Sequence, residues 1–394
     1  MSQACIAAAT MLPFAKYPDK SAAELGRAAI RRLLAQVDIP PSTIQAVYVG
    51  RSFAGAIDDQ ISVPGQVALR GTGIGDLPVA NFDNACAAVP TALHFAERAI
   101  STGQHDVILV VGMDKLFARE RSVSMRALIG AMDLEDARWM LEPKTLEGSV
   151  FMEHYYGKVA KDYLDRTGAT RRDLAAVAVK NRGHAALNDY AQYRTPLSPE
   201  AVLSAPVVAD PLTKLMCSPL TDGAVAMLVC SEKALGGIAG APPVRIASCV
   251  IRSGRPEGCP EDPALARTSR EAFDRAGLGP ENLDFAEVHE ASATGELIAT
   301  EELGLCGPGE GARLLRDGDT KLGGRIPVNV SGGLLSRGHP GAATGGAQLV
   351  ELVWQLQGRC ASRQIGNAKV GLAHSSGGLI GQEPACTAVT ILTR

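Results

Sequence analysis

Four side chains in this sequence have the chemistry to attack a carbonyl carbon or to move a proton. One is Cys86, which follows a predicted strand and precedes a helix that Pro90 can open as a first-turn residue. Unpaired amides at a helix start favour a thiolate over a thiol and can hold a developing oxyanion. We therefore expect Cys86 to have a lowered pKa and to act as a nucleophile. The alternative is a small buried residue, the commoner fate of an intracellular cysteine.

The other three are histidines that end a predicted strand or stand beside glycines. His339 lies in Gly338-His339-Pro340, His289 in Val288-His289-Glu290, and His374 precedes Ser375-Ser376-Gly377-Gly378 just after a predicted buried strand. Strand ends in α/β proteins are where sites gather, and a histidine is the usual general base at neutral pH. A purely structural role stays open for each histidine taken alone.

The elements that must position these side chains occur twice along the chain. A helix (22–34) and a strand (44–49) recur as 269–276 and 283–288 with the same turn between them. Each copy continues with a strand into a loop (79–86 and 326–333), a helix of small residues (89–102 and 342–357) and another strand (106–112 and 369–373). The sequence therefore predicts two α/β copies packed together.

A segment without a repeat partner separates the two copies. It is richer in charge, tyrosine and methionine, and its pattern is helical and loop-like. Because function often sits on such excursions, we interpret residues 114–213 as an inserted lid domain. The first half would comprise 1–113 with 214–238, and the second half 239–394.

Composition narrows the classes of partner and compartment. The net charge of −3 comes without a block of like charges, so we expect no nucleic-acid partner. Nine cysteines without a CxxC pair argue against a disulfide framework and against a structural zinc site. No apolar run approaches the ~20 residues of a membrane span. We expect a cytoplasmic protein with no bound metal.

Several long stretches resemble the thiolase family, and the branch with sterol-carrier-protein-type (lipid-transfer) thiolases in particular. They are NACAAVPTAL around Cys86, HEASA from His289, GGLLSRGHP ending at Pro340, VAVKNRGHAALNDYAQY and ADPLTKLMCSPLTDGA. The resemblance implies a duplicated five-layered α/β/α/β/α fold with an inserted helical lid. It also implies a homodimer, or a dimer of dimers. Coenzyme A would be a co-substrate, with no permanently bound cofactor.

The resemblance also assigns roles to single residues. Cys86 matches the nucleophile that accepts the acyl group, His339 the histidine that activates it, and His289 a position that is Asn in many members. The residues placed beside coenzyme A are Ser269, Ala291, Ser376 and Gly377. The family usually adds a second cysteine as acid and base, but its two usual positions here hold His374 and Ala291. His374 is our candidate for that role.

The predicted function is therefore acyl transfer through a Cys86 acyl-enzyme. It would be thiolytic cleavage of a 3-ketoacyl-CoA, as in acetyl-CoA C-acyltransferases, or the reverse Claisen condensation. One alternative is a specialised condensing or aromatic-acyl thiolase subunit that needs a small zinc-ribbon or OB-fold partner protein. Another is a non-catalytic protein that binds acyl-CoA or lipid. An aldol-cleaving relative ranks lower, because such a protein should lack Cys86.

Overall fold

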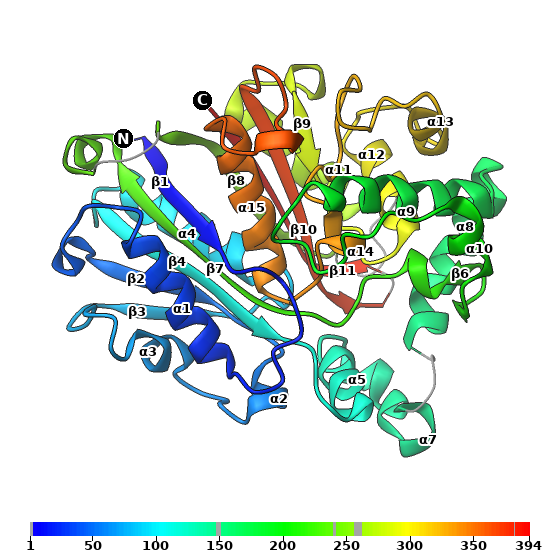
Figure 1. Cartoon of the computed structure of the whole chain (residues 1–394), viewed down its shortest axis with the longest axis horizontal. Helices are drawn as coiled ribbons and strands as arrows, with labels where there is room; N and C mark the ends of the chain where they lie inside the picture. Colours follow the sequence, from blue (N-terminus) through cyan, green and yellow to red (C-terminus); the bar gives the residue numbers. More distant parts are fainter. Residues whose placement is uncertain (1–2, 147–150, 239–241, 256–261, 382) are drawn as a thin grey trace.

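One large mixed sheet runs through the protein. A computed structural model describes residues 3–146, 151–238, 242–255, 262–381 and 383–394 (Figure 1). Within them the strand order is β3-β2-β4-β7-β1-β8-β11-β10-β9. The strands are β1 (Ala4–Met11), β2 (Ala46–Gly50), β3 (Val79–Phe82), β4 (Val107–Lys115), β7 (Asp222–Ser231), β8 (Val244–Ser253), β9 (Phe285–Glu287), β10 (Val370–Ile380) and β11 (Glu383–Thr393).

The predicted duplication is visible in the pairing of the strands. In the first half β2 pairs with β4 in parallel, and the pairs β4–β7 and β7–β1 are antiparallel. In the second half β9 pairs with β10 in parallel, and the pairs β10–β11 and β11–β8 are antiparallel. The halves meet at a short antiparallel pairing of β1 with β8. The counterpart of β3, predicted at 326–333, is not a strand. It is reduced to a bridge between Val328 and Ala286, because Pro327 has no N–H to donate and Asn329 turns left-handed with φ 57°.

Helices form three layers around the two half-sheets, which confirms the predicted five-layered fold. On the outside of the first half lie α1 (Ala22–Leu34) and α3 (Pro64–Leu69), and on the outside of the second half lie α11 (Ala264–Ala276) and α12 (Ala293–Glu302). Between the halves lie α4 (Ala88–Ser101) and α15 (Ala343–Leu356), which contact strands of both. Three separate hydrophobic cores hold these layers together.

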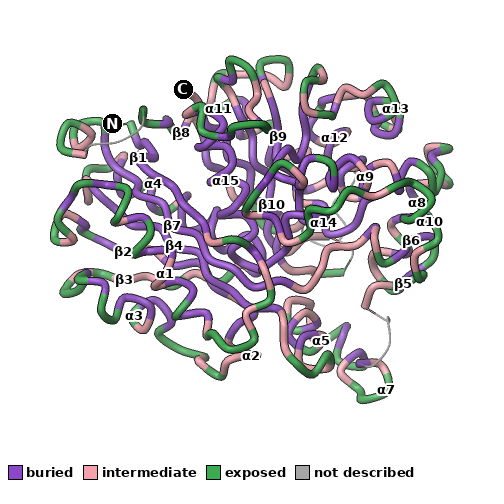
Figure 2. The backbone as a smooth tube through the Cα atoms, viewed as in Figure 1, coloured by how far each residue is buried: buried purple, intermediate pink, exposed green. Residues whose placement is uncertain are grey.

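The two central helices pack closely because glycine and alanine line their contact. Every residue of α15 is buried, as expected for a helix that is covered on all sides (Figure 2). A Cβ at Gly345 would lie 2.6 Å from Pro90 Cδ, and one at Gly346 would lie 2.9 Å from Val89 Cγ1. Gly345 and Pro90 both belong to the first turns of their helices, so the starts of α15 and α4 lie side by side. Cys86 and His339 precede these two starts.

The segment predicted as a lid is helical in its described part. Its helices are α5 (Arg121–Ile129), α6 (Leu134–Ala137), α7 (Pro143–Leu146), α8 (Lys158–Thr167), α9 (Arg171–Ala186) and α10 (Pro199–Ser204), with the short pair β5 (Val207–Ala209) and β6 (Leu212–Thr213). Helices α8, α9 and α10 share a hydrophobic core with α12. The boundaries of the three predicted segments stay a prediction.

The boundaries of α11 and β10 differ from the sequence prediction near candidate site residues. Helix α11 begins at Ala264, five residues before the predicted start at Ser269, because Pro263 supplies the preceding extended residue. His374 lies inside β10, whose pairing with β11 continues to Ile380. The remaining helices are α2 (Gly55–Asp58), α13 (Gly311–Arg316) and α14 (Gly333–Ser336).

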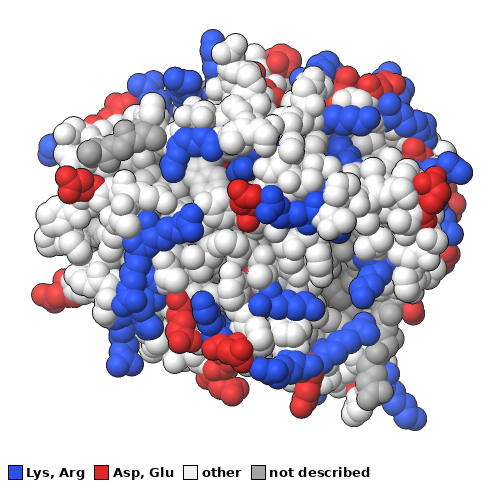
Figure 3. Space-filling view, viewed as in Figure 1, with Lys and Arg blue, Asp and Glu red and all other residues white. Residues whose placement is uncertain are grey.

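On the face shown in Figure 3, basic and acidic side chains are interspersed. No helix of the described chain is long and apolar enough to cross a membrane.

Candidate active site

Cys86 lies in a tight loop between β3 and α4. Ala85 before it adopts a left-handed backbone with φ 46°, which costs about 1–3 kcal/mol for a residue other than glycine. Its N–H donates to Asp83 Oδ1 at 3.0 Å. Strand β10 holds the loop from the other side, because Ser375 Oγ donates to the Cys86 carbonyl at 3.1 Å. The surrounding structure thus maintains a strained turn that presents the sulfur.

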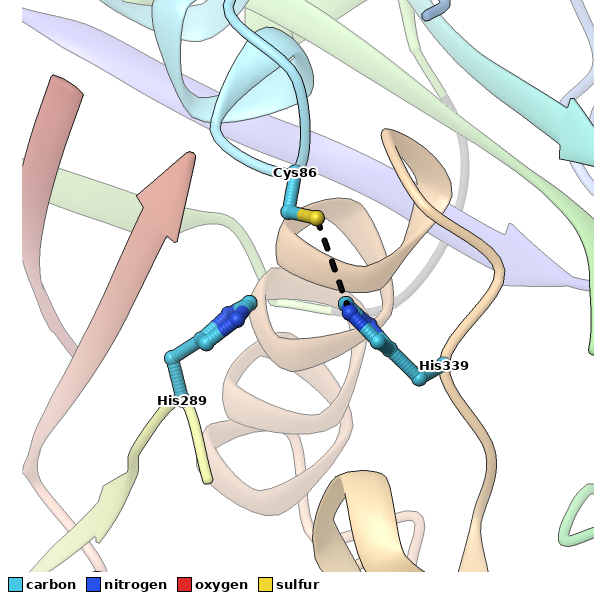
Figure 4. A group of neighbouring side chains, drawn as sticks. All are labelled: Cys86, His289 and His339. Atoms are coloured by element: carbon cyan, nitrogen blue, oxygen red, sulfur yellow. Dashed lines mark hydrogen bonds between the residues drawn. The ribbon is translucent and has the colours of Figure 1, made fainter. Parts of the chain in front are cut away.

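The cysteine sulfur faces the imidazole of His339. Cys86 Sγ lies 3.5 Å from His339 Nε2, and His339 Nδ1 lies 2.7 Å from Thr344 Oγ1 at the start of α15 (Figure 4). The backbone N–H of His339 donates to Thr221 Oγ1 at 3.1 Å. With Nδ1–H donating to Thr344, Nε2 is the nitrogen that accepts a proton from the thiol. This is the geometry of a nucleophile and its base.

The resting pair is a neutral thiol and a neutral imidazole. Burial raises the pKa of Cys86, and the charges of Asp114 and Asp83 add to the rise. Burial also holds the pKa of His339 well below its usual value, with smaller effects from His289 and Arg337. The predicted lowering of the Cys86 pKa by helix-end amides is therefore wrong, because desolvation of the buried sulfur outweighs those amides. Proton transfer to His339 has to accompany attack.

His289 completes a cluster of three groups. Its ring centroid lies 5.1 Å from that of His339, and both rings point toward Cys86 in Figure 4. Burial lowers the pKa of His289 to about 3, so its imidazole is neutral and can donate one N–H. The ligand atoms of Cys86, His289 and His339 lie within 4.8 Å of one another. Such a set can also hold a soft ion such as zinc, but an ion there would block the sulfur as nucleophile.

His374 lies next to His289. Its Nδ1 accepts from the His289 backbone N–H at 3.4 Å, and its Nε2 lies 2.8 Å from Ser376 Oγ. The ring centroids of His289 and His374 are 6.4 Å apart. Burial lowers the pKa of His374 to about 3. The neutral ring therefore has its Nε2–H directed to the Ser376 hydroxyl.

All four candidate catalytic residues line one cavity of about 1260 Å³. This exceeds the roughly 300–1000 Å³ of an ordinary small-molecule site. Ala291 and Ser376 line it too, together with residues of the lid segment such as Met125, Tyr156 and Arg182. Ser269 and Gly377 do not line it. Ser269 Oγ donates to Ala266 O at 3.0 Å inside α11, and a Cβ at Gly377 would lie 2.0 Å from Asn84 O.

The sequence matches two family models over most of its length. They are the thiolase N-terminal domain, over residues 4–233, and a thiolase C-terminal domain-like region, over residues 260–394. The chain belongs to the thiolase family. Its two matched regions correspond to the two halves of the duplicated sheet.

Curated thiolase-family relatives align with most of this chain. The benzoylsuccinyl-CoA thiolase subunit BbsB of Thauera aromatica is 37% identical, covering 90% of this chain and 89% of the relative. An acetyl-CoA acetyltransferase of Methanothermobacter thermautotrophicus is 34% identical, covering 85% and 86%. Sterol carrier protein 2 of Bos taurus is 30% identical, covering 92% and 66%. The last similarity bears out the predicted resemblance to that branch of the thiolase family.

Two solved structures share the fold. The Ltp2-ChsH2(DUF35) aldolase superposes with a TM-score of 0.81 at 24% identity, covering 99% of this chain and 97% of that chain. Human mitochondrial 3-ketoacyl-CoA thiolase superposes with a TM-score of 0.74 at 18% identity, covering 100% and 98%. At these identities the comparison shows the thiolase fold alone.

Some residues of this thiolase-family site were not anticipated from the sequence. Thr344 positions His339. The sequence feature that could have indicated it is a hydroxyl residue five positions after the histidine, at the start of the next helix. Behind the histidines, Arg337 pairs with Glu287 at 3.2 Å in a fully buried contact. Burial raises the Glu287 pKa to about 7, while Arg337 opposes the rise. Nothing in the spacing of Glu287 and Arg337 indicated this pair, because they lie on separate elements.

The raised Cys86 pKa predicts slow alkylation near neutral pH. Iodoacetamide reacts with thiolates, so its second-order rate constant with Cys86 should rise about tenfold per pH unit from pH 7 to 9 without a plateau. Peptide mass spectrometry would follow Cys86 separately from the other cysteines. A plateau below pH 8 would instead indicate a preformed thiolate–imidazolium pair and contradict the neutral resting state.

Proposed function

We propose that the protein is an acyl-CoA acyltransferase that works through a Cys86 acyl-enzyme. The reaction would be thiolytic cleavage of a 3-ketoacyl-CoA, or the Claisen condensation in reverse. The observation that carries the proposal is the 3.5 Å contact between Cys86 Sγ and His339 Nε2 in the wall of a large cavity. A protein that only binds acyl-CoA has no need of an aligned nucleophile and base.

In the cleavage direction the first step forms the acyl-enzyme. Cys86 Sγ attacks the 3-keto carbon while its proton passes to His339 Nε2, and the carbonyl oxygen becomes an oxyanion. The bond between C2 and C3 then breaks, which leaves the C3 acyl group on sulfur and an enolate of acyl-CoA. The enolate takes up a proton at C2 and leaves. The thiol of coenzyme A then attacks the Cys86 thioester and gives up its proton to the group that protonated the enolate. His339 returns its proton to the Cys86 sulfur, which leaves as the thiol.

The proton for the enolate must come from a group other than the family's usual second cysteine. We propose a relay from His374 through Ser376, because His374 Nε2 lies 2.8 Å from Ser376 Oγ and both residues line the cavity. His289 and protonated His339 can donate to the enolate oxygen, since their rings stand 5.1 Å apart. Ala291, at the other position where family members place that cysteine, offers no proton. Contact of Ser269, Ala291, Ser376 and Gly377 with coenzyme A stays a prediction.

Intact-protein mass spectrometry tests the acyl-enzyme directly. The protein should gain one acyl mass within minutes of mixing with acetyl-CoA or a 3-ketoacyl-CoA of moderate chain length. Free coenzyme A should discharge it. Tryptic mapping should place the acyl group on Cys86. Absence of an adduct with several chain lengths, while acyl-CoA still binds, would favour the non-catalytic binding protein.

A second candidate is a thiolase subunit that needs a partner protein. Two comparisons favour it, since one relative is named a subunit and one fold neighbour is the Ltp2-ChsH2(DUF35) aldolase. We propose that this partner is a small zinc-ribbon or OB-fold protein whose gene lies near the gene of this chain. Co-expression should raise turnover at least tenfold if the partner completes the site. Unchanged turnover together with independent elution of the two proteins would exclude that requirement.

We also propose that the protein forms a homodimer along β3. This strand is the last in the described sheet order, so one edge of it carries no strand of this chain. Phe95 stacks on Phe82 at 5.3 Å and is exposed beside it, and Ile61 and Val63 are exposed near the start of α3. Light scattering should give twice the 41.1 kDa of one chain, or four times that mass for a dimer of dimers.

A further inference from the structure

Arg182 is a buried cation in the wall of the cavity. It lies on α9 in the lid segment, 7% exposed, and the cavity that it lines also contains Cys86 and His339. Its Nε donates to Ser336 Oγ at 2.9 Å and its Nη1 to Thr195 O at 3.4 Å. The guanidinium stands 5.1 Å from the centre of the Tyr193 ring. These neutral contacts hold the side chain in place without neutralising its charge.

The absence of a carboxylate sets Arg182 apart from the other buried cations. Among the described residues, six lysines and arginines are at most 7% exposed, and five of them form an ion pair with an aspartate or glutamate. The pairs are Arg51–Asp58, Lys115–Asp222, Lys180–Glu296, Arg337–Glu287 and Arg363–Glu351. No described carboxylate pairs with Arg182. Because a buried charge is normally compensated, an anion from outside the chain fits this position.

Two short chains of contacts tie Arg182 to the catalytic base. Ser336, which accepts from Arg182, stands three residues before His339. Tyr193 donates its backbone N–H to Ser336 O at 3.0 Å. The neighbouring Gln192 contacts Thr221 Oγ1 at 2.6 Å, and that hydroxyl accepts the His339 N–H. The Arg182 guanidinium therefore lies in the same wall of the cavity as His339.

We propose that Arg182 binds a free carboxylate on the acyl group, so that the protein selects acyl-CoA substrates carrying a second, negatively charged acid group. A planar guanidinium can hold a carboxylate through two parallel hydrogen bonds. The phosphates of coenzyme A are the other anions of the substrate. They are separated from the thioester by the whole pantetheine arm, whereas Arg182 is tied to the residues around the base. The inference rests on the proposed function, which supplies the acyl-CoA.

Binding to a Cys86→Ala protein tests this inference without any chemistry at sulfur. Succinyl-CoA and butyryl-CoA have acyl chains of four carbons and differ in the terminal carboxylate. Calorimetry should show succinyl-CoA binding at least tenfold tighter. Arg182→Met should weaken succinyl-CoA binding by about 10- to 100-fold, the range for a lost charge-assisted hydrogen bond, and leave butyryl-CoA binding within about twofold. Arg182→Lys should bind succinyl-CoA with an affinity between those of the parent protein and Arg182→Met. Arg32→Met, which removes an exposed arginine stacked on Tyr190, should change neither.

The outcomes separate the possible roles of Arg182. Equal weakening of both coenzyme A thioesters by Arg182→Met would overturn the inference, because it would indicate either a structural role or a contact with a phosphate of coenzyme A. The same two acyl groups as N-acetylcysteamine thioesters, which lack phosphates, distinguish these two roles. Weaker binding of the coenzyme A thioesters alone would place a phosphate on Arg182. Failure of the proposed function would appear separately, as a wild-type protein that binds succinyl-CoA with this preference but never acylates Cys86.

Discussion

Replacement of Cys86 by alanine is expected to lower kcat/KM for thiolysis of a 3-ketoacyl-CoA by at least about a thousandfold, the scale seen when a covalent nucleophile is removed. The cause is local, because the sulfur lies 3.5 Å from the base and lines the substrate cavity. Alanine keeps the Cβ and the left-handed turn at Ala85, so the fold should be retained. The acyl adduct should be absent from intact mass spectra, while acyl-CoA still binds.

Cys217 offers a matched control for this experiment. It lines the same cavity and burial raises its pKa to about 12, but it lacks a histidine partner among its described contacts. Cys217→Ala should keep turnover within about threefold, because its thiol has no nearby base to activate it. The nucleophile would be misassigned if Cys217→Ala lost the adduct or if Cys86→Ala retained it.

The duplication explains how much of this site could be predicted from the sequence. Cys86 and His339 each precede a helix of small residues in equivalent positions of the two copies, and those helices form the central layer. Because the two copies are equivalent, both residues lie at the same end of the fold. The small residues of α4 and α15 were also visible in the sequence, whereas the five-layered order was implied by the resemblance to the thiolase family.

Features that depend on tertiary contacts could not be predicted in the same way. The pKa of Cys86 was expected to fall because helix-end amides are readable from the chain, but the desolvation that raises it depends on side chains from distant segments. A strand running into a loop was expected at 326–333 from its match to 79–86. That match does not reveal that Asn329 turns left-handed and uses its side chain to accept from Val288 N at 2.8 Å. Arg182 gave no signal, because a lone arginine on a helix is ordinarily exposed.

Replacement of His339 by glutamine should lower kcat/KM by about 10²- to 10⁴-fold at pH 7, the usual contribution of a general base. The Cys86 pKa is raised by burial, so without the base only a small thiolate fraction exists at this pH. That fraction grows tenfold per pH unit below the thiol pKa. The His339→Gln rate should therefore rise with pH up to at least pH 9. The wild-type rate should stay level from pH 6 to 8, because the His339 pKa lies well below its usual value.

Thr344→Val is the companion variant, because it leaves the base in place and removes only the hydroxyl 2.7 Å from its Nδ1. Loss of this one positioning contact should cost about tenfold in kcat/KM, in line with roughly 1–1.5 kcal/mol for a hydrogen bond. The level pH profile should persist, since Nε2 can still take the proton. A steep rise with pH in His339→Gln and a level profile in Thr344→Val would together assign proton acceptance to His339 and orientation to Thr344. If His339→Gln remained level with pH, another group would be taking the Cys86 proton, and the coupled transfer inferred from two neutral partners would be wrong.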